Sequence, residues 1–207
     1  PSLFSFNIPK SPLLDLSGIS LEDVEVSIAG TKLKERGPML LTHWGFSGPA
    51  VLRLSAWGAR ILQEMEYHAT LKIDWTPDTH VKDNLQKLKN EHPAKTFQLQ
   101  DIAPLPKNLA ERLLKLSVPY AHLKNSDIER IEQVLKRSTY QIEGKTTYKQ
   151  EFVTCGGVAL KEVNFQTMES KLCPGLYFAG EILDIDGITG GFNFQNAWTT
   201  GWIAGNA

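Results

Sequence analysis

The chain has 207 residues, 42% of them hydrophobic and 22% charged, which is ordinary for a soluble globular protein of one large domain or two small ones. The formal net charge of −1 gives no sign of binding to nucleic acid or to an anionic membrane, although a local patch would not show in it. No apolar run reaches the roughly 18 residues of a membrane span. Cys155 and Cys173 form no CxxC pair, so we expect reduced thiols and a cytoplasmic location.

Strand patterns dominate the first third of the chain. Side chains at residues 3–8 alternate between apolar and polar, and a second alternation over residues 24–28 ends at the turn-like run 29–32. Residues 39–42 form another short apolar run, and residues 67–75 alternate over nine positions. These runs predict a small β-unit.

A helix is predicted directly after residues 45–49, because the apolar positions from Ala50 to Ile61 take the spacing of a helix face. Ser47 is its predicted N-cap. Pro49 fits the first turn, where its missing N–H has no cost.

Helices are predicted to replace strands over residues 77–141. Apolar positions between residues 81 and 88 share one helix face, residues 107–116 form a second helix, and residues 126–129 have the capping-box pattern of a third. Helical spacing returns over residues 193–207.

The run of residues 175–195 carries the most specific chemistry. It predicts a buried strand, an acidic residue, Glu181, at the carboxyl end of that strand, a glycine turn and a helix start. Ligands of open α/β sheets lie at that end of the strands, and the N–H groups of a helix N-terminus attract an electron-rich ligand. Gly190 and Gly191 would let a bulky planar ligand approach the backbone. The local chemistry suits a flavin.

Three runs occur along the chain in the order found in one family: residues 37–49, residues 153–158 with 167–171, and residues 175–205. Together they resemble the YhiN/BaiN-like flavoproteins, FAD-dependent oxidoreductases within the wider group of two-dinucleotide-fold enzymes. The last run matches the C-terminal signature of that family without a gap.

This resemblance implies a mixed fold, α+β and α/β. Residues 1–8 would end a strand of the FAD domain, and residues 148–207 would form the C-terminal part of a two-dinucleotide-fold FAD-binding domain. Residues 9–147 would form an insert domain that shapes the substrate pocket. The insert would combine a β-barrel-like part, residues 9–76, with a helical subdomain, residues 77–141.

The same resemblance implies where FAD would bind. Glu181 would approach the ribityl-pyrophosphate part, and residues 190–193 would face the pyrimidine edge of the isoalloxazine ring. The implied cofactor-binding residues are Gly156, Gly157, Gly180, Glu181, Asp186, Gly190, Gly191, Phe192, Asn193 and Gln195. No metal site is expected, because Asp184 and Asp186 lack a third ligand.

No Gly-x-Gly-x-x-Gly run follows a predicted strand. The glycine turn that holds the FAD pyrophosphate is therefore expected to precede Pro1 in a longer protein. We expect the chain to be a C-terminal fragment of an enzyme, and to be inactive and to bind FAD weakly or not at all by itself.

His43 is the candidate catalytic acid or base, since histidine titrates near neutral pH and the resemblance places its loop at the interface between insert and flavin. A structural histidine stays the alternative at this position.

The predicted activity is hydride or electron transfer between FAD and an unidentified substrate. The resemblance leaves open a small molecule or an RNA nucleobase as substrate and NAD(P)H as electron donor, whereas DNA and membranes are not expected partners. A second hypothesis makes residues 9–147 mainly a binding module for RNA or a partner protein, although their basic residues are scattered among acidic ones.

Overall fold

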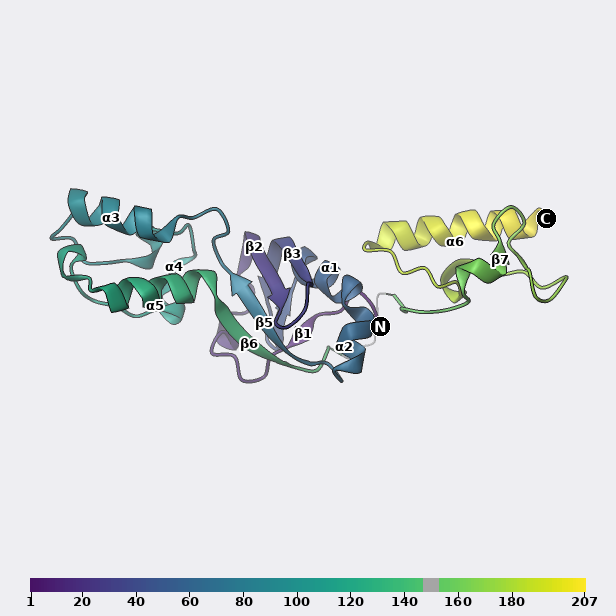
Figure 1. Ribbon diagram of the computed structural model, residues 1–207, viewed down its shortest axis with the longest axis horizontal. Helices are drawn as coiled ribbons and strands as arrows, with labels where there is room; N and C mark the ends of the chain where they lie inside the picture. Colours follow the sequence, from purple (N-terminus) through teal and green to yellow (C-terminus); the bar gives the residue numbers. More distant parts are fainter. Residues whose placement is uncertain (147–152) are drawn as a thin grey trace.

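The computed structural model describes residues 1–146 and 153–207. Three parts follow one another along its long axis: a helical part, a sheet in the middle, and a C-terminal segment that ends in a long helix (Figure 1). The predicted boundary between residues 147 and 148 lies outside the described residues. None of the helices in the two described ranges is long and apolar enough to cross a bilayer.

Six strands form the central sheet, in the antiparallel order β1-β4-β3-β2-β5-β6. Their bounds are β1 (Phe6–Asn7), β2 (Ser20–Ile28), β3 (Lys34–Leu41), β4 (Gly45–Ser47), β5 (His68–Asp74) and β6 (Ser138–Glu143). The predicted alternation is visible in β2, where Val24, Val26 and Ile28 are buried. The turn predicted over residues 29–32 joins β2 to β3.

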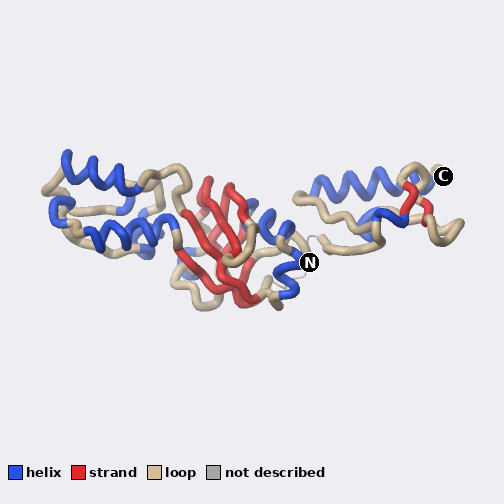
Figure 2. The backbone as a smooth tube through the Cα atoms, viewed as in Figure 1, coloured by secondary structure: helices blue, strands red, loops and turns tan. Residues whose placement is uncertain are grey.

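The first and last strands bring the sheet close to a barrel. Asn7 N donates a hydrogen bond to Gly144 O at 3.0 Å, and Thr146 N donates to Ser5 O at 3.2 Å. These contacts join the start of the described chain to the end of β6, so the sheet is nearly closed and the predicted β-barrel-like fold is confirmed (Figure 2).

Two short helices, α1 (Pro49–Trp57) and α2 (Ala59–Glu64), follow β4. The predicted helix is confirmed, but its predicted N-cap is wrong. Ser47 belongs to β4, and its hydroxyl accepts a hydrogen bond from Ser5 Oγ at 2.6 Å. Gly48 is the N-cap instead, with a φ of 94°. A Cβ at Gly48 would lie 3.0 Å from Leu40 N, so the close backbone approach favours glycine here.

The helical part consists of α3 (Val81–Glu91), α4 (Lys107–Leu113) and α5 (Asn125–Lys136), joined by loops that contain the 3-10 turns Leu99–Asp101 and Tyr120–His122. The predicted capping box over residues 126–129 is wrong by two positions. Lys124 is the N-cap, and its backbone N donates to Asp127 Oδ2 at 2.9 Å, so the side chain of Asp127 caps the helix start.

Residues 138–141, which the sequence places in the helical part, belong to β6. The reason is a change of period. Tyr140 and Ile142 point to one face while Thr139 and Gln141 are exposed, and residues 138–143 pair with β5.

One hydrophobic core continues from the sheet into the helical part. Trp75 and Tyr140 pack edge to face at the junction, and Trp75 N donates to Leu135 O at 2.8 Å. Burial raises the pKa of the Tyr140 hydroxyl, which therefore stays neutral. The Lys136 ammonium donates to Asp74 Oδ2 at 3.1 Å and to Thr76 O at 2.5 Å. These contacts fix the helical part on the sheet.

The C-terminal segment contains β7 (Val163–Asn164), β8 (Glu169–Ser170) and α6 (Gly190–Gly205). Its small core has Val163, Met168 and Leu183 at the centre, with partly buried side chains such as Phe178 and Ile203 packed against them. The predicted buried strand near residues 175–179 is wrong for this chain. It forms a single bridge between Tyr177 and Glu169, and the side chains of Leu176 and Tyr177 are exposed. The neighbour of this run is the two-residue strand β8: Ser170 N donates to Leu176 O at 2.7 Å, and Phe178 N donates to Met168 O at 3.0 Å. This neighbour is too short to extend the pairing along the whole run.

Candidate functional site

A hydrogen-bonded loop precedes α6. Thr189 is the N-cap, and its Oγ1 accepts from Phe192 N at 3.2 Å. The amide of Asn193 holds the loop, since its Oδ1 accepts from Gly187 N at 2.8 Å and its Nδ2 donates to Gly187 O and Thr189 O at 2.9 Å each. The predicted helix thus begins at Gly190, three residues earlier than the apolar spacing indicates. Both the oxygen and the nitrogen of the Asn193 side-chain amide hold the loop.

The two glycines at the start of α6 face open space. A Cβ added at Gly190 or Gly191 would meet no heavy atom within 4 Å. The first N–H groups of a helix have no intrahelical partner, so a ligand can approach them here. Gly187 differs, because a Cβ there would lie 2.0 Å from Phe192 Cδ1. Gly187 is therefore required for packing, while Gly190 and Gly191 leave room for a planar group.

Gly180 and Glu181 connect this helix to the rest of the segment. Gly180 N donates to the buried Thr200 Oγ1 at 2.8 Å, and Gly180 has a φ of 73°. Glu181 is exposed, and its Oε1 accepts from Thr154 N at 2.6 Å. Sequence reasoning missed Thr189 and Thr200. A threonine before a helix start is a typical N-cap, so the role of Thr189 could have been predicted from the sequence. The role of Thr200 could not, because it depends on a tertiary contact with Gly180.

The predicted pair Gly156 and Gly157 lies beside the same region. A Cβ at Gly157 would be 2.4 Å from Ile182 O, so this glycine permits two backbones to approach. Val158 N then donates to Ile182 O at 2.8 Å. Gly156 has a φ of 99° and open space around it. The structure therefore brings Gly156, Gly157, Gly180 and Glu181 together.

The remaining predicted residues lie on the loop and on α6. Asp186 is half-buried, and Phe192 has 58% of its surface exposed. Gln195 is exposed and donates from Nε2 to Thr199 Oγ1 at 2.9 Å.

The loop before α6 packs on the helices beside the sheet. Arg60 of α2 donates two hydrogen bonds of 2.9 Å to the carboxylate of Asp184, which raises the pKa of Arg60. Ile188 packs against a small cluster around Leu3 and Ala56. The C-terminal segment thus contacts the α1–α2 side of the sheet.

His43 lies at a tight turn between β3 and β4, where Thr42 N donates to Gly45 O at 2.8 Å. The side chain of His43 is exposed and lines a cavity of about 420 Å³. The other lining residues are Phe4, Ser5, Ser17, Gly18, Leu40, Leu41, Thr42, Trp44, Ser47 and Thr146. Leu3 belongs to the cluster that Ile188 packs against, and the next two residues, Phe4 and Ser5, line this cavity.

Helix α6 exposes large apolar side chains. Phe194, Trp198 and Trp202 have 63%, 69% and 71% of their surfaces exposed, and Thr200 is the buried residue of the helix. Their spacing of four residues places these three side chains along one face of the helix. A contiguous exposed apolar face is typical of an interaction surface.

Comparisons with known proteins agree with this architecture. Residues 1–153 match the family described as "HI0933-like protein barrel and H2TH domain". The chain is 35% identical over 208 residues to the ribosomal RNA dihydrouridine synthase of Escherichia coli (strain K12), covering 97% of the chain and 50% of that protein. It is 32% identical over 218 residues to the 3-dehydro-bile acid delta(4,6)-reductase of Clostridium scindens, covering 100% of the chain and 53% of that protein.

A third relative is the ribosomal RNA dihydrouridine synthase of Haemophilus influenzae, 30% identical over 203 residues, with 96% of the chain and 48% of that protein covered. The chain thus spans about half the length of the curated relatives it matches. It belongs to the HI0933-like family, and its resemblance to the YhiN/BaiN-like flavoproteins is confirmed.

Proposed function

We propose that the intact protein is an FAD-dependent oxidoreductase that adds two hydrogens to a carbon–carbon double bond conjugated to a carbonyl group. The two kinds of name among its relatives support this reaction class. Dihydrouridine differs from uridine by two hydrogens on the ring double bond next to a carbonyl. A delta(4,6) double-bond system in a 3-dehydro steroid is likewise conjugated to the C3 ketone. Different substrates thus share one chemistry.

The observation that carries the proposal is the open start of α6 beside the loop that Asn193 holds. The residues present fit a flavin, because a Cβ at Gly190 or Gly191 would fill space that a planar ring needs. The N-terminal end of the helix would stabilise negative charge on the pyrimidine edge of a reduced flavin. Reduced FAD, when bound, supplies the hydride.

The exposed apolar face of α6 supports the same proposal. We infer that residues 153–207 form one wall of an FAD-binding domain, and that the rest of the intact protein covers Phe194, Trp198 and Trp202. In this arrangement Glu181, Gly180, Gly156 and Gly157 lie along the cofactor, with Asp186 and Gln195 as further contacts. The chain by itself would then be inactive.

His43 is the proposed proton donor to the substrate carbon next to the carbonyl. It lines a cavity together with Phe4 and Ser5, which follow Leu3 of the cluster that Ile188 packs against. The hydroxyls of Ser5 and Ser47 lie in the same cavity and offer hydrogen bonds that would orient a carbonyl-bearing ring. NAD(P)H as the source of electrons and a cytoplasmic location stay predictions.

A uracil ring in ribosomal RNA is the substrate that we favour, since two of the three relatives above carry that name. The alternative substrate is a small molecule with an enone group, as the name of the bile-acid relative indicates. A role of residues 9–147 in binding, as a module for RNA, is compatible with the enzyme and does not replace it.

The test uses the intact protein loaded with FAD and reduced without oxygen. Unmodified ribosomal RNA transcribed in vitro is expected to restore the oxidised flavin spectrum, and mass spectrometry is expected to show a uridine that has gained two hydrogens. A steroid enone serves as the second substrate. A protein that takes up no FAD, or a reduced flavin that neither substrate reoxidises, would contradict the proposal.

A further inference from the structure

Charge is distributed unevenly between the parts of the molecule. Residues 77–141 contain eleven lysines and arginines and eight aspartates and glutamates, and the other residues contain eleven and fifteen. The helical part therefore has an excess of three positive charges, and the rest has an excess of four negative charges. The net charge of −1 conceals this difference.

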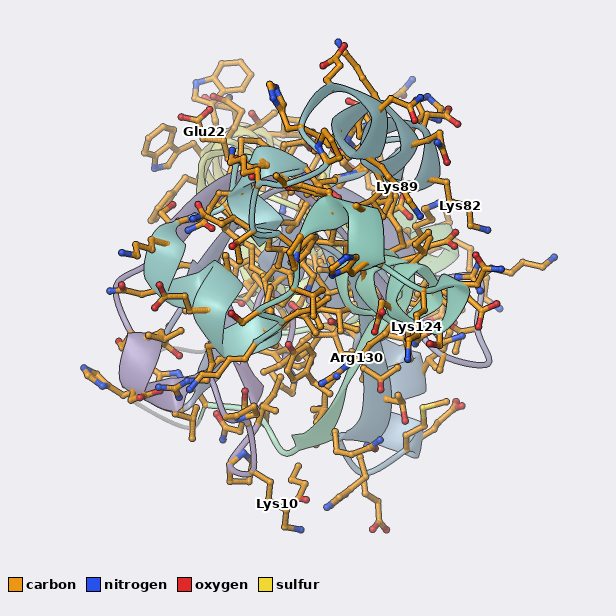
Figure 3. All side chains as sticks on the ribbon, turned by 90° about the vertical axis from the view of Figure 1, so that its left-hand side faces the viewer. Lys10, Glu22, Lys82, Lys89, Lys124 and Arg130 are labelled. Atoms are coloured by element: carbon orange, nitrogen blue, oxygen red, sulfur yellow. The ribbon has the colours of Figure 1, made fainter. Side chains whose placement is uncertain are left out.

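Four basic side chains lie at the end of the molecule that the helical part forms, and we call them the basic tip. They are Lys82, Lys89, Lys124 and Arg130, on α3 and α5. Figure 3 shows these four on one side of that end, with Glu22 at the opposite edge and Lys10 apart from both.

Two contacts fix the relative positions of α3 and α5 under the basic tip. Lys82 Nζ lies 3.1 Å from Glu132 Oε2, and Lys89 Nζ donates to Leu123 O at 3.3 Å. Since Leu123 directly precedes Lys124, the side chain of Lys89 reaches the start of α5. Lys89 and Lys124 therefore share one end of the helix pair.

Three of the four members of the basic tip lack a counter-charge. Among the residues that the structure describes, Lys82 is the member of the tip with a carboxylate within 4 Å. Of the seven other cations of residues 77–141, four have such a partner, and Lys87, Lys115 and Arg137 have none among the described residues. These pairs are Lys95 with Asp101, Lys107 with Glu111, Arg112 with Asp15, and Lys136 with Asp74.

Uncompensated like charges on one surface repel each other, and a bound polyanion relieves that repulsion. Lysine and arginine bind phosphate oxygens with charge-assisted hydrogen bonds. The position of the tip narrows the ligand further. In Figure 1 the helical part and α6 lie at opposite ends of the long axis, so a small molecule bound at α6 cannot also contact the tip. A long polymer can.

We propose that the basic tip is a docking surface for the phosphate backbone of ribosomal RNA, which would hold the RNA while a uridine enters the cavity lined by His43. This inference rests on the proposed function for its choice of RNA. The basic tip would hold the RNA in position without selecting its base sequence, because contacts to phosphates do not distinguish the bases.

The experiment replaces three members of the tip in the intact protein, as Lys89→Gln, Lys124→Gln and Arg130→Gln together. Lys82 is left in place because it pairs with Glu132. The control is a triple variant with the same charge change at exposed lysines elsewhere: Lys32→Gln, Lys72→Gln and Lys161→Gln. Binding to in vitro transcribed bacterial ribosomal RNA is measured over a range of salt concentrations. Circular dichroism and FAD content show whether each variant is folded and loaded.

The tip variant is expected to bind RNA roughly tenfold or more weakly near physiological salt and to lose about two units of slope in log K against log salt. The control is expected to keep both. Equal affinity and slope in the tip variant and the wild type would overturn the inference, as would equal losses in both variants. Capture of a partner protein by the tip without RNA binding would also overturn it.

These outcomes are separate from those of the proposed function. If the intact protein binds no FAD, the proposed reaction fails while the RNA-binding measurement still decides on the tip. If FAD is bound and the tip variant keeps its RNA affinity, the docking surface fails alone.

Discussion

The burial of large aromatic side chains differs between residues 1–146 and residues 153–207. In the first region one continuous core includes Phe46, Trp75 and Tyr120, all nearly inaccessible to solvent. In the second, Trp198 and Trp202 are more than two-thirds exposed. The first region thus buries its large aromatic side chains, while the second leaves those of α6 exposed. Under the proposed function, the second region depends more than the first on contacts with the rest of the intact protein.

The largest expected effect on the free energy of unfolding comes from replacing one large aromatic residue of each region with alanine. Phe46→Ala should destabilise both the 207-residue chain and the intact protein by about 3–5 kcal/mol, because it leaves a cavity in a closed core. Trp198→Ala should cost less than about 0.5 kcal/mol in the chain alone and about 3 kcal/mol or more in the intact protein. Denaturant unfolding of both lengths measures the four values. Similar costs for Trp198→Ala in both lengths would remove the contrast.

A sharper test lies within the C-terminal segment. Gly191→Val should leave the stability of the intact protein within about 1 kcal/mol, because its Cβ meets no neighbouring atom, yet weaken FAD binding about tenfold or more by occupying the ligand's space. Gly187→Val is the matched variant, and its side chain would collide with Phe192, so it should lower stability as well. Flavin titration and thermal unfolding are measured together. Unchanged FAD affinity in Gly191→Val would place the cofactor elsewhere.

The smallest effect concerns acid stability on the surface of the sheet. Arg36 donates hydrogen bonds to Asp23 and Asp78 and holds the pKa of both carboxyls below their usual range. A lowered folded pKa contributes stability above the unfolded pKa near 3.9, and that contribution is lost as pH falls through the folded pKa. Arg36→Gln should therefore raise both pKa values in an NMR titration and narrow the difference in stability between neutral and acid pH. Unshifted carboxyl titrations would show that the pairing is absent in solution.

The sequence predicts local structure well wherever one periodicity dominates. The alternation over residues 24–28 and 67–75 becomes β2 and β5, because period two buries one face of a sheet. The closure of the sheet could not be predicted, since it joins Asn7 to Gly144 across most of the chain. The N-cap at Gly48 depends on a close approach to Leu40, which spacing does not reveal.

The sequence predicts the glycine loop and the helix of the candidate site, but not the contacts that hold them in place. The glycine pair 190–191 and its helix are visible in the sequence as a turn before an apolar stripe. The amide of Asn193 is used by the loop itself, and Thr200 contacts Gly180 only in the folded segment. The side chains of residues 175–179 suit a strand, but the neighbouring β8 has only two residues, so the pairing does not extend beyond a single bridge.

The central claim is that residues 153–207 form one wall of an FAD site that the intact protein completes. The most direct measurement is the absorbance of bound flavin per mole of protein, after incubation with FAD and desalting, for the intact protein and for the 207-residue chain. The account predicts about one flavin per intact protein and almost none on the chain alone, since the remaining contacts come from outside it. A chain that retains one flavin by itself, or an intact protein that retains none, would contradict it.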